Sequence, residues 1–349
     1  MQTRRRLPAE WEPHEAILLG FPHNSRDWPG KFEAAQWAFV DFIKKITTFE
    51  KLYLFVKNTV HKNNALAMLT KNHVDVSQIQ FIEQDTNRGW MRDCGPVIVY
   101  DQDDKREVLQ FNFNAWAKYT NFRKDRNVPE KTAAFMQLPL TKTLFKNKHV
   151  VLEGGAIDGN GNGVLLTTEE CLLDPDTQIR NKGFEKSDYE ALFLEYFGVE
   201  QVIWLKKGIV GDDTHGHVDD ISRFVNENTV ITCVESNPKD ENYTLLQENL
   251  SILRQTRLNN GKVLQIVELP MPHPVYFDGM RLPASYANFL ILNQAVLVPT
   301  FNDANDAKAI QIIQDCFPKR TVIGIHALDL VWGLGTLHCL SHELPAKKS

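Results

Sequence analysis

Cysteine is scarce in this chain, and the spacing of the few cysteines excludes two common stabilising devices. The 349 residues include 5 cysteines, and no two of them form a Cys-x-x-Cys pair. An odd number of widely separated cysteines does not suit a disulfide framework, and thiolate zinc sites need closely spaced pairs. The sequence therefore predicts single thiols in a reducing compartment, with neither a disulfide nor a thiolate metal site.

Long apolar runs and a surplus of positive charge are missing as well. No stretch of about 18 apolar residues, the length that spans a bilayer, occurs in the sequence. The arginines at positions 4–6 precede Pro8, Glu10 and Glu12, which do not form the apolar core of a signal peptide. The 39 basic and 44 acidic residues give a net charge of −5, whereas a nucleic-acid site needs a basic stripe. We expect a cytoplasmic protein that binds neither membranes nor nucleic acid.

The chain also lacks linkers. No low-complexity or Gly/Ser-rich segment divides it, and its 43% hydrophobic and 24% charged residues are ordinary for a globular protein. Its length suits either one large domain or two smaller ones. In the absence of a boundary, we predict one domain over residues 1–349.

A strand, a polar loop, a second strand and a helix recur along the sequence. Runs rich in Val, Ile and Leu indicate strands at 80–83, 96–100, 149–152, 164–168, 201–205, 230–234, 263–269, 295–298, 322–325 and 337–340. Helical patterns fall between them at 34–46, 60–72, 186–197, 241–258 and 304–315. Such α/β units repeated around a centre would gather their polar loops into one cleft.

One of these loops holds a cysteine in an unusual setting. Cys339 follows the turn formed by Gly333, Leu334 and Gly335 and is preceded by His338. Paired glycines permit a tight turn and a close approach of the backbone to a ligand. A thiolate in such a loop can act as a nucleophile, although most free cysteines are simply small buried side chains. Both interpretations of Cys339 stay open at this point.

A second loop presents a histidine and a carboxylate two residues apart. If Val218 faces inward on an extended segment, His217 and Asp219 point together to the opposite face. That arrangement offers a general base and a carboxylate to one ligand. A solvated acidic turn is one alternative, and a metal site formed with His215 is another.

Two further loops supply carboxylates and an aromatic ring. Asp93 follows Trp90 closely, and Glu153 precedes a pair of glycines. Alone, an acidic residue beside glycine is typical of a turn. Together, two carboxylates match the forked N–H donors of a guanidinium, and an indole face can cover such a cation. The four loops therefore favour a guanidino ligand.

Several segments, in chain order, resemble those of the agmatine deiminase family, which includes the bacterial type of peptidyl-arginine deiminase. The resemblance rests on Leu7–Glu15, Trp90–Pro96, Phe113–Trp116, Val151–Gly155, Leu166–Leu172, Gly216–Asp219, Leu282–Phe289 and His338–Cys339. It extends over nearly the whole chain.

This resemblance implies a fold, an active site and a reaction. The fold is the pentein fold, an α/β five-bladed propeller of pseudo-fivefold ββαβ units. The implied residues are the nucleophile Cys339, the acid–base His217, the guanidinium-binding Asp93 and Asp219, and the substrate-site Glu153 and Trp90. No metal or organic cofactor is implied. The implied partner is a small guanidino substrate, and a homodimer is left open.

The implied reaction is hydrolysis of agmatine to N-carbamoylputrescine and ammonia through a covalent thiouronium. Asp212 and Asp213 are acidic residues beside the site that suit the distal amine of agmatine. Free arginine would need a cation aimed at its carboxylate, and Arg92 is the basic residue of the site segments. Peptidyl-arginine is the alternative substrate. A cysteine peptidase and a non-catalytic, protein-binding propeller are rivals that an ammonia-release assay would separate.

Overall fold

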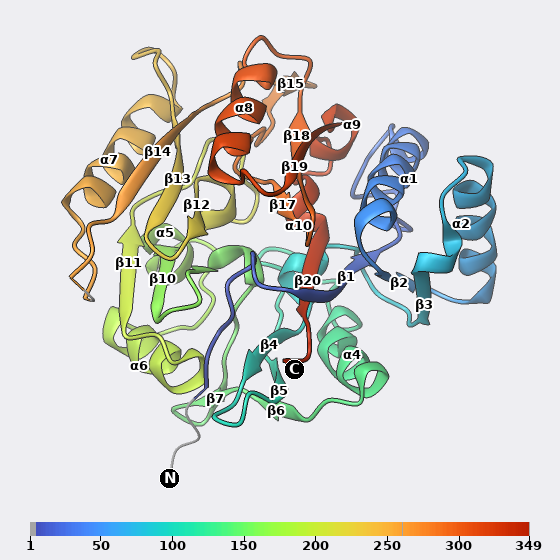
Figure 1. The fold of residues 1–349 in the computed structure, drawn as a ribbon, viewed down its shortest axis with the longest axis horizontal. Helices are drawn as coiled ribbons and strands as arrows, with labels where there is room; N and C mark the ends of the chain where they lie inside the picture. The colour runs from blue at the N-terminus through green and yellow to red at the C-terminus, as the bar shows by residue number, and fades with distance from the viewer. Residues whose placement is uncertain (1–4, 260, 349) are drawn as a thin grey trace.

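The computed structural model describes residues 5–259 and 261–348. Within these residues the chain forms five sheets of three or four strands (Figure 1). Within each sheet, neighbouring strands are named next to one another. The four-stranded sheet consists of β20 (Ser341–Pro345), β1 (His14–Gly20), β2 (Leu52–Val56) and β3 (Ile79–Glu83). The three-stranded sheets consist of β4 (Val97–Tyr100), β5 (Arg106–Gln110) and β6 (Leu140–Lys142); β9 (Asp158–Gly159), β10 (Val164–Thr168) and β11 (Gln201–Leu205); β12 (Ser222–Asn226), β13 (Thr229–Val234) and β14 (Gln265–Pro270); and β17 (Leu290–Ile291), β18 (Ala295–Thr300) and β19 (Thr321–His326).

The same strand pairing recurs in these sheets. The pairs β4/β5, β9/β10, β12/β13 and β17/β18 are antiparallel, and each second strand then pairs in parallel with β6, β11, β14 or β19. In the remaining sheet, β20 from the C-terminal end pairs antiparallel with β1, which pairs in parallel with β2. The end of the chain thus completes the sheet that its beginning starts.

Helices connect the parallel strands and lie toward the outside of the molecule in Figure 1. The longer ones are α1 (Phe32–Phe49), α2 (Thr59–Lys71), α4 (Val128–Met136), α6 (Lys186–Phe197), α7 (Asn242–Gln255) and α8 (Asp306–Cys316). All five helices expected from the sequence are present. Helix α4 was not expected, because it has only 9 residues and a proline in its first turn.

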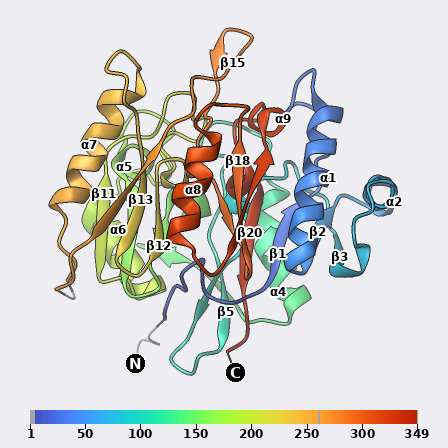
Figure 2. The ribbon, with the colours of Figure 1, turned by 45° about the horizontal axis from the view of Figure 1, so that its top comes forward.

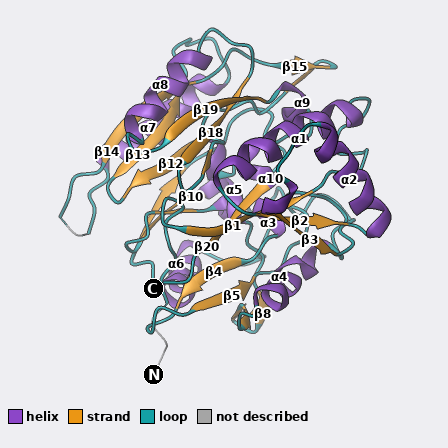
Figure 3. Ribbon diagram, turned by 45° about the vertical axis from the view of Figure 1, so that its right-hand side comes forward, coloured by secondary structure: helices purple, strands orange, loops and turns teal. Residues whose placement is uncertain are grey.

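The remaining elements are short. They are α3 (Met91–Cys94), α5 (Glu169–Leu173), α9 (Leu328–Val331), α10 (Leu337–Leu340), the 3-10 turns η1 (Val76–Gln78), η2 (Asp125–Asn127), η3 (Gly154–Ala156) and η4 (Val218–Asp220), and the two-stranded pairs β7 (Leu144–Phe145) with β8 (Lys148–His149) and β15 (Tyr276–Phe277) with β16 (Met280–Arg281). Those labelled in Figure 3 include α3, α5, α9, α10, β8 and β15.

Two predicted strands are wrong. Residues 337–340 form helix α10, and only His149 of 149–152 lies in a strand, with Val151 in an isolated bridge to Asn112. A four-residue apolar run does not distinguish a buried strand from a buried helical turn, and both of these segments are buried for the most part.

Apolar side chains from strands and helices form the core. Every residue of β2 and β10 is buried, whereas α1 buries one face that includes Phe39 and Phe42. Both chain ends lie at one end of the molecule, and the β15–β16 hairpin projects from the other (Figure 2). Among the described residues, no helix is both long enough and apolar enough to cross a bilayer.

Candidate active site

A cavity of about 370 Å³ brings together residues that are far apart in the sequence. Its walls include Cys339, Asp93 and Trp90, which come from α10, α3 and the residue just before α3. His217, Asp219 and Glu153 are fully buried behind this wall. The structure therefore assembles the predicted thiol, imidazole, carboxylates and indole around one space.

Cys339 is held at the base of this cavity. Its Sγ lies 2.9 Å from Nδ2 of Asn288 and 3.7 Å from Oδ2 of Asp219. Gly335 makes the approach possible, because a Cβ there would lie 2.7 Å from the ring of Trp90 and 3.0 Å from the Cβ of Cys339. The glycine-containing turn noted in the sequence thus permits close packing of the thiol loop against the indole.

Asn288 is a site residue that the sequence analysis did not single out. Its Oδ1 accepts hydrogen bonds from Thr336 Oγ1 at 2.7 Å and from the backbone N–H of His338 at 3.0 Å. Its Nδ2 donates to the sulfur of Cys339 and, at 2.9 Å, to Oδ1 of Asp220. Asn288 therefore holds both the backbone and the sulfur of the thiol loop. The only sequence signal was its place in the family-like segment 282–289.

Asp93 lines the cavity, and two N–H groups donate hydrogen bonds to its carboxylate. Trp116 Nε1 donates to its Oδ2 at 2.8 Å, and the backbone N–H of Gly155 donates to its Oδ1 at 3.2 Å. Burial, opposed by His217 and reinforced by the negative charges of Asp219 and Glu153, raises the pKa of Asp93 to about 6. Repulsion between carboxylates in an empty guanidinium site predicts such a raised pKa.

Trp116 is a second residue that sequence analysis left without a role. Ala115, Trp116 and Ala117 all have positive φ, at 51°, 58° and 53°. Three successive left-handed residues other than glycine are costly and are held only by surrounding contacts. This turn directs the indole N–H of Trp116 to Asp93. Backbone strain of this kind has no recognisable sequence pattern.

Asp219 is oriented by a buried hydrogen-bond chain. His338 Nδ1 lies 2.7 Å from Oδ2 of Asp219, and His338 Nε2 lies 3.0 Å from Oε2 of Glu10. Burial favours the neutral form of Asp219, but the hydrogen bond and the charge of His338 bring its pKa below the ordinary value. The carboxylate of Asp219 is therefore anionic near pH 6, whereas about half of the Asp93 carboxyl groups carry a proton at that pH.

His217 lies directly before η4, so the extended segment assumed in the sequence analysis is wrong. Its Nδ1 is 3.7 Å from Oδ1 of Asp93, and neither ring nitrogen has a hydrogen-bond partner among the described residues. A Cβ at Gly155 would lie 2.5 Å from this Nδ1, so only glycine fits there. Burial lowers the pKa of His217, but Asp93, Cys171 and Asp219 together raise it well above its usual range. The imidazole is therefore a proton donor.

Asp212 supports His217 from the preceding loop. Its Oδ2 accepts from the backbone N–H of His217 at 3.0 Å and of Gly216 at 2.8 Å, and its Oδ1 accepts from Thr214 N at 2.7 Å. Both oxygens are used inside the loop, so Asp212 shapes the loop rather than reaching a ligand.

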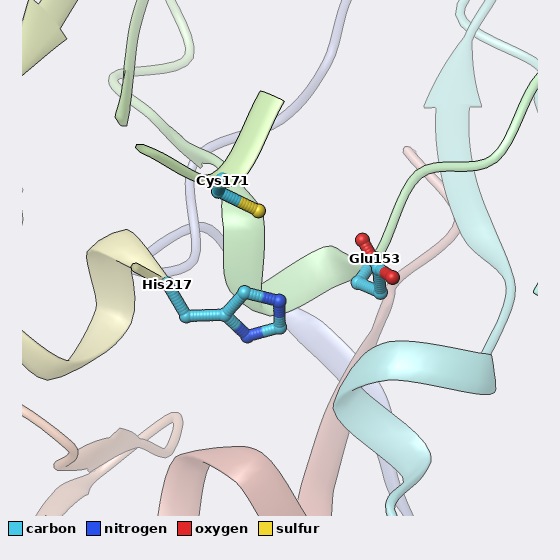
Figure 4. A group of neighbouring side chains, drawn as sticks. All are labelled: Glu153, Cys171 and His217. Carbon is cyan, nitrogen blue, oxygen red and sulfur yellow. The ribbon is translucent and has the colours of Figure 1, made fainter. Parts of the chain in front are cut away.

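Glu153 lies near the imidazole of His217 and the thiol of Cys171 (Figure 4). Arg180 Nε donates to its Oε1 at 3.0 Å, and its Oε2 has no partner among the described residues. One potential metal-ligand atom from each of Glu153, Cys171 and His217 lies within 4.8 Å of the others, and the same holds for Asp219, Asp220 and Cys339. A metal ion in either group would occupy the catalytic groups themselves, so we assign no metal to them.

The alternative metal site with His215 is not assembled. His215 Nε2 lies 2.8 Å from Oδ2 of Asp174, and His215 has a positive φ of 65°. This backbone conformation separates the two histidines of the loop, and the groups of potential metal ligands around His217 do not include His215.

The mouth of the cavity carries both signs of charge. Asp213 lines it, but Lys118 bonds to one of its oxygens and Tyr119 donates to the other at 2.7 Å. Arg92 is buried outside the cavity wall, where its Nη1 pairs with Glu343 at 2.7 Å. The cations that line the cavity are Arg26 and Arg88, which sequence analysis did not single out because they lie outside the family-like segments.

Comparisons with known proteins place the chain in a family. The sequence model of the Porphyromonas-type peptidyl-arginine deiminases matches residues 6–345. The agmatine deiminase of Pseudomonas aeruginosa is 31% identical over 98% of this chain and 96% of its own.

Solved structures agree over the same extent. The C. jejuni agmatine deiminase with substrate bound has a TM-score of 0.87 at 30% identity, over 99% of this chain and 97% of its own. The agmatine deiminase of Enterococcus faecalis has a TM-score of 0.89 at 28% identity, over 99% and 97%. The chain therefore belongs to the Porphyromonas-type peptidyl-arginine deiminase family, alongside the agmatine deiminases, and has their mixed α/β pentein fold.

Proposed function

We propose that this protein is an agmatine deiminase that hydrolyses agmatine to N-carbamoylputrescine and ammonia. One observation carries the proposal: the sulfur of Cys339 shares a cavity with Asp93 and lies 3.7 Å from Asp219. Two carboxylates beside a nucleophile suit a guanidinium, which binds carboxylates through paired N–H donors. A peptidase would need no such carboxylates beside its thiol.

The substrate itself would activate the thiol. Burial and the charges of Asp219, Asp220 and Asp93 raise the pKa of Cys339 well above its usual range. A bound guanidinium places a positive charge against the same carboxylates, so it lowers the cost of ionising the neighbouring sulfur. The thiolate therefore forms when the cation binds, and the empty enzyme keeps an unreactive thiol.

The reaction then follows in two halves. The thiolate of Cys339 bonds to the central guanidinium carbon, which gives a neutral tetrahedral adduct. The imidazolium of His217 protonates one nitrogen, and the carbon–nitrogen bond breaks to release ammonia and leave a cationic thiouronium. Neutral His217 then takes a proton from water as the oxygen bonds to the same carbon. Breaking the carbon–sulfur bond restores the thiolate and yields the urea, and the remaining proton leaves with ammonia as ammonium.

Two further residues have supporting roles in this proposal. Trp90 lines the cavity and stacks on Trp28, with 5.5 Å between ring centroids, so its indole is a fixed wall for the planar cation. Glu153, paired with Arg180, adds negative charge near His217.

A substrate panel tests the proposal. Agmatine, free arginine and a peptidyl-arginine would be compared by ammonia release and by formation of the ureido product, with Cys339→Ala as the inactive control. Fastest turnover of agmatine is expected. Faster turnover of peptidyl-arginine would favour a peptidyl-arginine deiminase, and no ammonia from any of them would favour the protein-binding alternative.

We propose in addition that the five sheets are the blades of a five-bladed propeller and that residues 1–349 act as one domain in the cytoplasm. The recurring antiparallel-then-parallel pairing supports the propeller, as does the pairing of β20 with β1 across the chain ends.

A further inference from the structure

The β15–β16 hairpin covers one side of the cavity mouth. Phe277, Asp278 and Met280 of this hairpin line the same cavity as Cys339. Figures 2 and 3 both show the hairpin at the end of the molecule away from the chain termini. The side chains that a substrate meets beyond its guanidinium therefore include those of this hairpin.

The turn of the hairpin does not itself require a charged residue. Asp278 has a φ of 49° and Gly279 a φ of 76°, as the two central residues of a type I′ turn do. Asparagine suits the first of these positions as well as aspartate does. The carboxylate of Asp278 is therefore a separate feature, which an asparagine would remove without changing the turn.

The hairpin has a defined position relative to the nucleophile. At its base, Arg281 Nη1 pairs with Oδ1 of Asp240 at 2.9 Å, and both side chains are buried. Near its tip, the ring of Phe277 packs edge-on against Trp332, which directly precedes the turn leading to Cys339. These contacts fix the position of the hairpin, on which Asp278 is exposed and lines the cavity.

The other carboxylates of the cavity wall are already engaged. Asp93 belongs to the guanidinium site, Asp27 pairs with Arg88 at 2.7 Å, and Asp213 is bonded by Lys118 and Tyr119. In the described part of the chain, Asp278 has neither an ion pair nor a side-chain hydrogen bond. Arg26 and Arg88 also line the cavity and would repel a cation, which favours the unpaired carboxylate of Asp278 for any positively charged group.

We propose that Asp278 binds the distal ammonium of agmatine, with Phe277 and Met280 covering the carbon chain. The inference rests on the proposed function and names the residue that reads the substrate tail. A long ammonium-bearing substrate anchored at Cys339 would extend within the cavity that Asp278 also lines. Asp278 is the carboxylate there that can accept the ammonium without giving up another partner.

The test compares two substrates that differ only at the tail. Agmatine would be measured beside pentylguanidine, in which a methyl group replaces the ammonium. Asp278→Asn should lower kcat/KM for agmatine by roughly three- to tenfold, mainly through KM, because it removes a partly exposed charge-assisted hydrogen bond. Its kcat/KM for pentylguanidine should stay within about twofold of the wild type, and Asp278→Lys should lose more on agmatine than Asp278→Asn does.

Asp104→Asn is the matched control. Asp104 is also an exposed aspartate with positive φ, at 57°, but it lies between β4 and β5 and is not part of the cavity wall. It should leave both substrates unaffected. Equal losses on both substrates in Asp278→Asn, or no loss on either, would overturn the role of Asp278 while agmatine turnover by the wild type upholds the proposed function. A wild-type protein inactive on agmatine would refute both.

Discussion

Replacing Asp93 by asparagine should nearly abolish turnover of agmatine. The carboxylate is 4% exposed and faces the substrate cavity, so a bound guanidinium would form a desolvated charge pair with it. Removing one partner from such a pair costs about 3–5 kcal/mol. At 1.36 kcal/mol for each factor of ten, kcat/KM should fall by roughly two to four orders of magnitude.

The same replacement should not weaken the fold. The pKa of Asp93 is raised from its ordinary value of 3.8 to about 6, which corresponds to about 3 kcal/mol of stability lost at neutral pH. Because the folded state holds this proton more tightly, the loss develops as the pH rises from about 4 to about 6. An uncharged asparagine avoids that cost. It gives up one of the hydrogen bonds from Trp116 and Gly155, worth about 1 kcal/mol.

Two measurements on Asp93→Asn therefore have opposite expected outcomes. Ammonia release from agmatine should fall at least a hundredfold, while thermal unfolding at pH 7 should show a Tm equal to or above that of the wild type. Asp104→Asn, on the surface, should change neither. Activity within about tenfold of the wild type would refute the guanidinium role of Asp93. A clearly lower Tm at pH 7, with no difference in stability between pH 4 and 7, would refute the argument from its raised pKa.

Three further predictions follow from the same site. A haloacetamidine, which mimics the guanidinium and carries a leaving group, should label Cys339, because its cation would bind Asp93 and Asp219 beside this sulfur and favour the thiolate, whereas Cys94 does not line the cavity; labelling that survives in Cys339→Ala would contradict this. Below about pH 6, kcat/KM for agmatine should fall about tenfold per pH unit as Asp93 gains a proton, and a flat profile down to pH 5 would exclude that titration. Dialysis against EDTA should leave ammonia release unchanged, because side chains alone carry the proposed chemistry, and activity that returns only with an added divalent ion would overturn this.

Local features of the sequence were enough to predict most helices and the residues that gather at the cavity. The helix expected at 186–197 is α6. Its limits agree because a capping box of Glu185 and Asp188 begins the helix and Gly198 ends it, and both signals are local in the sequence. Cys339 could be singled out because a glycine-containing turn and a histidine precede it. His217 and Asp219 could be singled out because they occur together in a short polar segment. In each case the informative residues are near neighbours in the chain.

The tertiary structure alone decided how these groups are held and charged. Asn288 contacts the sulfur of Cys339 from 51 positions away, and Glu10 reaches Asp219 through His338 from the start of the chain. An uncharged amide in an apolar segment carries no local sign of such a role. Likewise, Asp93 and Asp219 are both aspartates beside the same cavity, but their pKa values move in opposite directions. The difference arises because a histidine from another part of the chain donates to only one of them, and burial and electrostatic fields depend on three-dimensional neighbours rather than on sequence neighbours.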